Sequence, residues 1–301
     1  MGYHLRIQKT IEFIETHLDE PLMLRELAEL AGFSEFHYHR VFQSMVGDPV
    51  MEYVRKRRLA KAAAHVADPE RRIVDVALDH GFQTHETFTR AFKRMFGMTP
   101  GEYRRRGIRA PSYPKADVLT RRYNPYLGGI RMEYRIVDKP AFKVIGYALE
   151  TTSEDGQNHR EIPAFWQDYL LNRRGDRIPN AVEREHPVNL GICTDFNMET
   201  CRFTYLIGRE AEHFDNVPSD LVCREFPGAA YAVFTTPKVP PKDFSPTIQE
   251  TWRLIFDQWF PHSGYEHAGL AEFEWYDERA NPETDGTQQM EIYIPVKPRN
   301  S

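Results

Sequence analysis

The sequence predicts a multi-domain protein in which an all-α domain with two helix–turn–helix units precedes an α+β domain of two strand–helix–hairpin repeats. The chain of 301 residues is long enough for two ordinary domains. Helical periodicity occupies the first third, and strand-like segments alternate with helical ones in the remainder. Each part also repeats itself, at an offset of 49 or 50 residues in the first part and of 87 or 88 in the second. We therefore expect domains at residues 1–107 and 131–298, joined by a linker at 108–130.

The composition is that of an ordinary globular protein, with 41% hydrophobic and 28% charged residues. No apolar run is long enough to span a membrane, and the N-terminus lacks the pattern of a secretory signal. The three cysteines have neither metal-ligand spacing nor an even count for disulfides. We expect a cytoplasmic protein with no membrane partner, no metal site and no cofactor. Residues 1–110 carry 18 Lys and Arg against 15 acids, and residues 111–301 carry 21 against 29, which suggests different partners for the two parts.

The first part has the periodicity and the caps of a helical domain. Ile7, Ile11 and Ile14 recur at spacings of four and three, which marks one apolar helix face. Ser34 and Thr84 stand where N-caps are expected, because their hydroxyl groups accept hydrogen bonds from the first helical turn. Helices are expected at residues 7–18, 24–30, 34–46, 50–66, 73–79, 84–96 and 101–105.

The repeat in the first part is a duplicated helix–turn–helix unit. Gly32 recurs 49 residues later as Gly81, and Arg40 recurs 50 residues later as Arg90. We expect the extra residue inside the second helix of the second unit. Each unit then consists of a short helix, a turn with a glycine and a second helix.

The second helix of such a unit enters the major groove of DNA, where its side chains contact base edges. Arginine can bind guanine through two hydrogen bonds, His and Glu can hydrogen-bond to base edges, and Phe can pack on a thymine methyl group. The predicted DNA-contacting residues, all expected on exposed faces, are Phe36, His39, Arg40, His85, Glu86 and Arg90. The basic run at residues 55–58 is equally consistent with phosphate contact and with a solvated surface.

The second part alternates between strand and helix patterns. Tyr205-Leu206-Ile207 recurs 88 residues later as Tyr293-Ile294-Pro295, which indicates a duplicated strand–helix–hairpin unit. Strands are expected at residues 132–137, 142–151, 188–195, 202–207, 229–236, 271–276 and 290–296, and helices at 162–171 and 247–259. For the first two segments, one bent strand is the alternative to two separate strands.

The chemistry of the second part centres on an acid among aromatic residues. No nucleophile motif, phosphate loop or paired-histidine spacing occurs, so no catalytic residue is predicted. Glu274 lies between Phe273 and Trp275, and strand alternation points it to the opposite face from both. A carboxylate among aromatic rings attracts a lipophilic cation. The alternative is that these aromatic residues only form the core between sheet and helices.

The motif Phe-Thr-Arg-Ala-Phe-Lys-Arg at 88–94, followed by Phe-Gly-Met-Thr-Pro-Gly-Glu-Tyr-Arg at 96–104, resembles the signature of the AraC/XylS family of transcription regulators. The resemblance covers residues 1–107. It implies seven helices that bind double-stranded DNA, with base contacts from the third and sixth. With the DNA-binding domain first, the architecture is similar to that of the Rob-type members. No operator sequence is implied, because those members have other residues at four of the predicted contact positions.

The segments Phe-Glu-Trp-Tyr at 273–276 and Glu-Ile-Tyr-Ile-Pro-Val at 291–296 resemble the GyrI-like effector-binding domains, over residues 131–298. The resemblance implies a hydrophobic pocket between the two repeats, with Glu274 facing it. The predicted ligand-binding residues are Glu274, Trp166, Tyr147, Tyr293 and Trp275.

These expectations describe a bacterial one-component transcription regulator that binds promoter DNA, senses a small amphipathic effector and is not an enzyme. A cation is one candidate effector, and RNA polymerase is a candidate partner. Two alternatives stay open for the second domain: a hydrolase that uses the glutamate as a general base, and a ligand-free module that docks a protein. Two recognition helices in one chain predict a monomer. The sequence does not identify the effector, or distinguish activation from repression.

Overall fold

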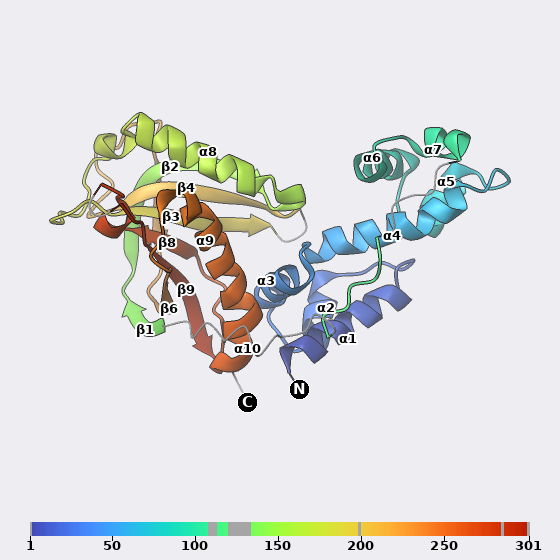
Figure 1. Ribbon diagram of the computed structural model, residues 1–301, viewed down its shortest axis with the longest axis horizontal. Helices are drawn as coiled ribbons and strands as arrows, with labels where there is room; N and C mark the ends of the chain where they lie inside the picture. The colour runs from blue at the N-terminus through green and yellow to red at the C-terminus, as the bar shows by residue number, and fades with distance from the viewer. Residues whose placement is uncertain (1, 108–112, 120–133, 198–199, 284–285, 300–301) are drawn as a thin grey trace. The chain divides into compact units, whose positions relative to one another are not determined.

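The computed structural model describes residues 2–107, 113–119, 134–197, 200–283 and 286–299. The chain divides into two compact units, 1–123 and 124–301 (Figure 1). Within the described residues, no helix has the length and apolar character that a membrane span requires.

The first unit is helical throughout its described elements, as predicted. Helix boundaries differ from the expected ones by a few residues at most. The helices are α1 (Tyr3–Thr16), α2 (Leu24–Ala31), α3 (Glu35–Val46), α4 (Val50–Val66), α5 (Ile73–Asp79), α6 (His85–Phe96) and α7 (Pro100–Arg106).

Helices α3 and α6 are equivalent in length, caps and position in the repeat. Each has 12 residues, and the N-cap hydroxyl of Ser34 or Thr84 accepts a hydrogen bond from the backbone N–H three residues later. The prediction that the extra residue lies inside the second helix is wrong. It is Gln83, in the turn, because two steps separate Gly32 from its cap residue and three separate Gly81 from Thr84. The cap must precede the helix directly, so the turn absorbs the insertion.

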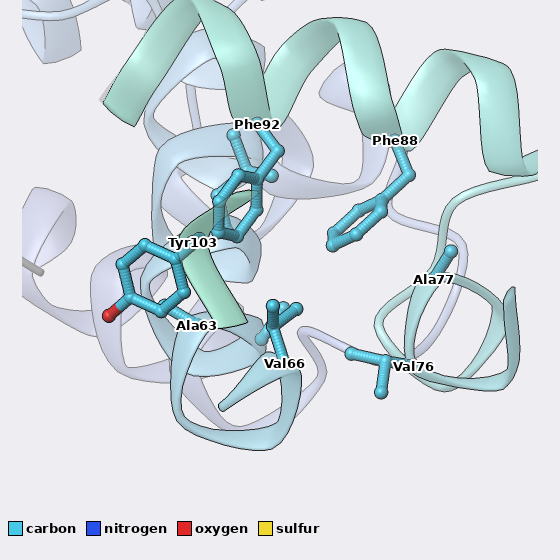
Figure 2. Close-up of a cluster of buried hydrophobic side chains, with 9 residues drawn as sticks. Ala63, Val66, Val76, Ala77, Phe88, Phe92 and Tyr103 are labelled. Carbon is cyan, nitrogen blue, oxygen red and sulfur yellow. The ribbon is translucent and has the colours of Figure 1, made fainter. Parts of the chain in front are cut away.

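The core of the second helix–turn–helix unit forms around α6. Figure 2 shows Phe88 and Phe92 pointing from α6 towards Val66 of α4 and Val76 of α5, with Tyr103 of α7 beside Phe92. The Phe92 and Tyr103 ring centroids lie 5.3 Å apart with the rings nearly perpendicular. Burying this face fixes which side of α6 is left for solvent.

The described part of the predicted linker, residues 113–119, packs against the first unit. The N–H of Ala116 donates to the Tyr53 hydroxyl at 3.1 Å, and the N–H of Val118 donates to the Gln8 side-chain carbonyl at 3.0 Å. This segment therefore belongs to the same compact unit as the helices. The other linker positions lie outside the described residues.

The second unit contains an antiparallel sheet. Its order is β1-β6-β9-β8-β3-β4-β2-β5, and β7 pairs with β9. The strands are β1 (Tyr134–Lys139), β2 (Phe142–Thr152), β3 (Asn189–Asn197), β4 (Arg202–Ala211), β5 (Val222–Phe226), β6 (Ala229–Thr235), β7 (Tyr265–His267), β8 (Glu272–Tyr276) and β9 (Glu291–Pro298).

The helices of this unit are α8 (Asn158–Leu171) and α9 (Pro241–Leu254). Helix α9 continues through a π-helical turn (Ile255–Trp259) into α10 (Phe260–Ser263). Short 3-10 turns occupy Glu154–Gly156, Arg174–Arg177 and Glu278–Ala280.

The duplication is visible in the strand order, and it is larger than predicted. Each repeat is strand–strand–helix–strand–strand: β1-β2-α8-β3-β4 and β5-β6-α9-β8-β9. The first strand of each repeat pairs with the second strand of the other, β1 with β6 and β5 with β2. Strands β5 and β7 were not predicted, because both are short and lack a strong apolar alternation. The repeats meet at the antiparallel pair β3–β8.

The two faces of the sheet are packed differently. On one face, Phe142 of β2 contacts Phe273 of β8, with ring centroids 5.5 Å apart, and this face forms an apolar core. Helix α8 lies over the other face (Figure 1). On this face, Ile207 of β4 belongs to a cluster that includes Tyr169 of α8. We call this second side the helix face.

Candidate DNA interface and candidate ligand site

The polar side of α6 is exposed, as predicted. His85, Glu86 and Arg90 are exposed, opposite the buried Phe88 and Phe92. Hydrogen bonds from its own backbone N–H and from Thr84 hold the pKa of Glu86 below its usual value. Glu86 is therefore an ionised acceptor at the start of the helix, and Arg90 lies about one turn further along.

The equivalent surface of α3 is smaller than predicted. Phe36 and Arg40 are half-buried, and the expectation that His39 is exposed is wrong, because only 1% of it is accessible. At about 100° per residue, His39 lies only about 60° around the helix from the core residue Phe42. Burial, assisted by the nearby charge of Arg40, lowers the pKa of His39 to about 3. His39 is thus a neutral, buried side chain.

The basic run of α4 is engaged in ion pairs and hydrogen bonds within the first domain. Three of its residues form ion pairs: Arg55 with Glu52, Lys56 with Asp48, and Arg57 with Glu15. The fourth, Arg58, donates to the carbonyl oxygens of Leu18 at 2.7 Å, Glu20 at 2.6 Å and Gly81 at 3.2 Å. Arg58 therefore ties the segments that follow α1 and α5 to the long helix α4.

In the second domain, Glu274 is the centre of a buried hydrogen-bond network on the helix face. Its Oε2 accepts from the Tyr205 hydroxyl at 2.6 Å and from the Tyr276 hydroxyl at 3.0 Å. Its Oε1 accepts from the Trp252 indole N–H of α9 at 2.9 Å. The Trp166 indole N–H of α8 donates to the Tyr205 hydroxyl at 2.8 Å. One carboxylate is therefore connected to α8 and to α9.

Gly191 of β3 makes room for this network. It lies directly opposite Glu274 in the β3–β8 pair. A Cβ atom at this position would lie 2.2 Å from the Tyr205 hydroxyl oxygen and 2.8 Å from Glu274 Oε2. Only glycine allows the two side chains to meet above the strand.

Burial dominates the electrostatics of Glu274. It raises the pKa of the carboxyl group above its usual value, and the hydrogen bonds from Tyr205, Trp252 and Tyr276 offset only part of that effect. All three donors are neutral, so none of them cancels the charge of the carboxylate. Trp252 and Tyr276 are half-buried, and Glu274 itself is 9% exposed. The arrangement favours a positive group, because aromatic faces and the carboxylate both attract it.

The predicted ligand-binding residues separate into two groups. Glu274, Trp166 and Tyr147 share the helix face, with Tyr169 linking the last two at ring-centroid distances of 5.7 Å and 6.2 Å. Trp275 and Tyr293 lie on the opposite face, as members of the apolar core around Phe273. Those two residues therefore do not line the surroundings of Glu274.

Four residues of the network are not among the predicted ligand-binding residues: Gly191, Tyr205, Trp252 and Tyr276. A signal existed for Tyr205, which begins the first copy of the repeated Tyr-hydrophobic-hydrophobic motif. Tyr276 follows Glu274 by two positions and shares its face by strand alternation. Gly191 carries no local signal, because only the pairing of β3 with β8 brings it to Glu274.

The first unit is a tandem helix–turn–helix domain, and the second buries a carboxylate among aromatic side chains. This is the organisation of a transcription regulator with an effector-binding domain. Residues 135–296 match the family described as Cass2, integron-associated effector binding protein, and residues 27–106 match the helix-turn-helix family HTH_18. The chain belongs to the AraC-type regulators, with an effector-binding domain of the Cass2, GyrI-like family.

Three relatives illustrate this membership. The chain is 47% identical over 104 residues to the uncharacterized HTH-type transcriptional regulator YbfP of Bacillus subtilis, which is 35% of each chain. It is 31% identical over 216 residues to the transcriptional regulator Rob of Salmonella typhimurium, covering 61% of this chain and 74% of Rob. It is 39% identical over 106 residues to the regulatory protein SoxS of the same organism, covering 35% of this chain and 99% of SoxS.

Proposed function

We propose that this protein is a one-component transcription regulator, whose first domain binds double-stranded DNA and whose second domain binds a small lipophilic cation. The ligand proposal rests on one observation: Glu274 is a buried carboxylate whose three hydrogen-bond donors are neutral. A charge in this situation is costly unless an opposite charge joins it. The DNA proposal rests on family membership and on the exposed side of α6.

The proposed DNA contacts come from α3 and α6. Phe36 and Arg40 of α3, and His85, Glu86 and Arg90 of α6, would contact base edges; His39 leaves the set because it is buried. Helix–turn–helix proteins that use two recognition helices bind sites about one helical turn, or about 10 base pairs, apart. Selection of bound sequences from random DNA by the full chain tests this. Two enriched elements at that spacing are expected, and recovery of DNA without any enriched element would contradict the proposal.

The ligand proposal is tested with a matched pair of probes, the cation methyltriphenylphosphonium and the neutral triphenylphosphine oxide. Glu274→Gln removes the charge and nearly keeps the shape. We expect the variant to weaken binding of the cation by about 1.5–3 kcal/mol, the range for hydrogen bonds to charged groups, and to affect the neutral probe much less. Isothermal titration calorimetry measures both. Equal losses for the two probes would show that Glu274 has a structural role only.

A further inference from the structure

A second buried carboxylate lies beside the first. Glu272 precedes Glu274 by two residues on β8 and is 2% exposed. Strand alternation places both side chains on the helix face, about 7 Å apart at their origins. Two acids at this separation, away from bulk water, affect each other's ionisation.

The partner of Glu272 is a histidine whose protonation is defined by its contacts. His267 of β7 is fully buried, and its Nδ1 accepts the backbone N–H of Gly269 at 2.9 Å. Nδ1 therefore carries no proton, and the ring proton is on Nε2, which lies 3.0 Å from Glu272 Oε1. His267 therefore lies against Glu272 as a neutral ring, and it adds no positive charge to the pair.

Among the described residues, the side chains that donate to Glu274 are neutral. They are the hydroxyls of Tyr205 and Tyr276 and the Trp252 indole of α9. Cys193 lies opposite Glu272 on β3. β9 places Ile292 opposite Glu274. The nearest cation along α9, Arg253, pairs with Glu250 and Asp257.

We propose that Glu272 and Glu274 act as a coupled carboxylate pair, in which a bound cation replaces one proton. This inference rests on the proposed function, because it concerns the same ligand site. It makes Glu272 a determinant of specificity for positive charge, and His267 the group that positions it. The empty pair holds one proton at acidic pH, since the two buried charges repel each other. A cation compensates that repulsion and releases the proton.

The proposal predicts the direction in which the affinity for a cation changes with pH. Affinity for methyltriphenylphosphonium rises with pH, by up to tenfold per pH unit, until the pair is fully ionised. In Glu272→Gln the rise moves to lower pH by about one to two units, because Glu274 no longer has an acidic neighbour. The affinities of the wild type and Glu272→Gln converge at acidic pH, where the wild-type pair already holds its proton, and diverge at alkaline pH.

The experiment is a calorimetric titration of the full chain with methyltriphenylphosphonium between pH 5 and pH 9. Glu225→Gln serves as the control, because it removes an exposed acid on the edge strand β5, several strands away from β8, and is expected to leave the pH profile unchanged. In the wild type, titrations in two buffers of different ionisation enthalpy count the protons released, so the test does not depend on a variant that folds. A fraction of one proton is expected near the middle of the rise.

The outcomes separate this inference from the function on which it rests. If Glu274→Gln leaves the cation affinity unchanged, the proposed ligand site itself is wrong. If Glu274→Gln weakens binding but Glu272→Gln leaves the pH profile in place, or the wild type releases no proton, the coupled pair is wrong and the ligand site stands.

Discussion

Replacing Gly191 by alanine tests whether the network around Glu274 is as tightly packed as the structure indicates. The added Cβ would lie 2.2 Å from the Tyr205 hydroxyl oxygen, so Tyr205 must move away from Glu274. Overpacking costs about 1–3 kcal/mol, and a weakened hydrogen bond to a carboxylate adds to it, which gives a loss of about 2–4 kcal/mol in the free energy of unfolding. For a domain of this size the melting midpoint falls by about 5–15 °C.

Intrinsic tryptophan fluorescence during thermal unfolding is the assay for this variant. All four tryptophans lie in the second unit, so intrinsic fluorescence follows the unfolding of that domain within the full chain. The control is Gly101→Ala in α7, where a Cβ meets no atom within 4 Å. In a helix this change is expected to stabilise the first domain by about 0.5–1 kcal/mol and to leave the fluorescence transition unchanged.

A second variant shows whether the clash is the cause. Tyr205→Phe removes the hydroxyl oxygen, although the ring carbon beneath it would still lie 3.0 Å from the new Cβ. In the Gly191→Ala background, Tyr205→Phe should therefore cost about 1–2 kcal/mol less than it does alone. A Gly191→Ala protein that melts like the wild type, or a double variant whose losses simply add, would refute the reasoning.

Two predictions concern the first domain. Arg40→Ala and Arg90→Ala should each weaken specific DNA binding by about 1–3 kcal/mol, and each should relax the base preference in a different one of the two DNA elements. Gel shifts on the selected site and its point mutants measure both effects. If both variants lost preference in the same element, the assignment would be contradicted. Because burial lowers the pKa of His39 to about 3, its protonation favours the unfolded state, so stability is full above about pH 6.5 and falls below it. Urea unfolding followed by far-UV circular dichroism should show about 2 kcal/mol of this loss by pH 5, and His39→Phe should remove that part; an unchanged pH dependence in the variant would show that His39 is protonated in the folded domain.

Local sequence signals were sufficient for the helices of the first domain. The caps Ser34 and Thr84 and the glycines that follow α3 and α6 act within a few residues, so they are visible without tertiary information. The orientation of Glu274 was predictable for the same reason, because strand alternation is a property of the backbone. His39 was predicted to be exposed but is buried. Helical periodicity locates the centre of the buried side of a helix, whereas the width of that buried side depends on the residues that pack against it.

The partners of Glu274 show where local signals end. Tyr205 lies 69 residues from Glu274 along the chain, and Trp252 lies 22 residues away. Their contacts exist only because β3 pairs with β8 and α9 lies over that pair. The same limit applies to Tyr293. Its pairing opposite Phe273 places its side chain in the core on the other face of the sheet.

The exchange of first strands between the two repeats has a consequence for how this domain folds. β1 completes the edge beside β6, and β5 completes the edge beside β2, so neither repeat contains all the strands of its own half of the sheet. Tyr134 pairs with Phe234, which lies 100 residues later in the chain, so the outer strand docks only after most of the domain has been synthesised. A single copy of the repeat would complete its sheet only by exchanging strands with another copy. Because this chain joins both copies, the exchange of strands takes place within one molecule. We therefore expect the two halves of the sheet to fold and unfold as a single cooperative unit.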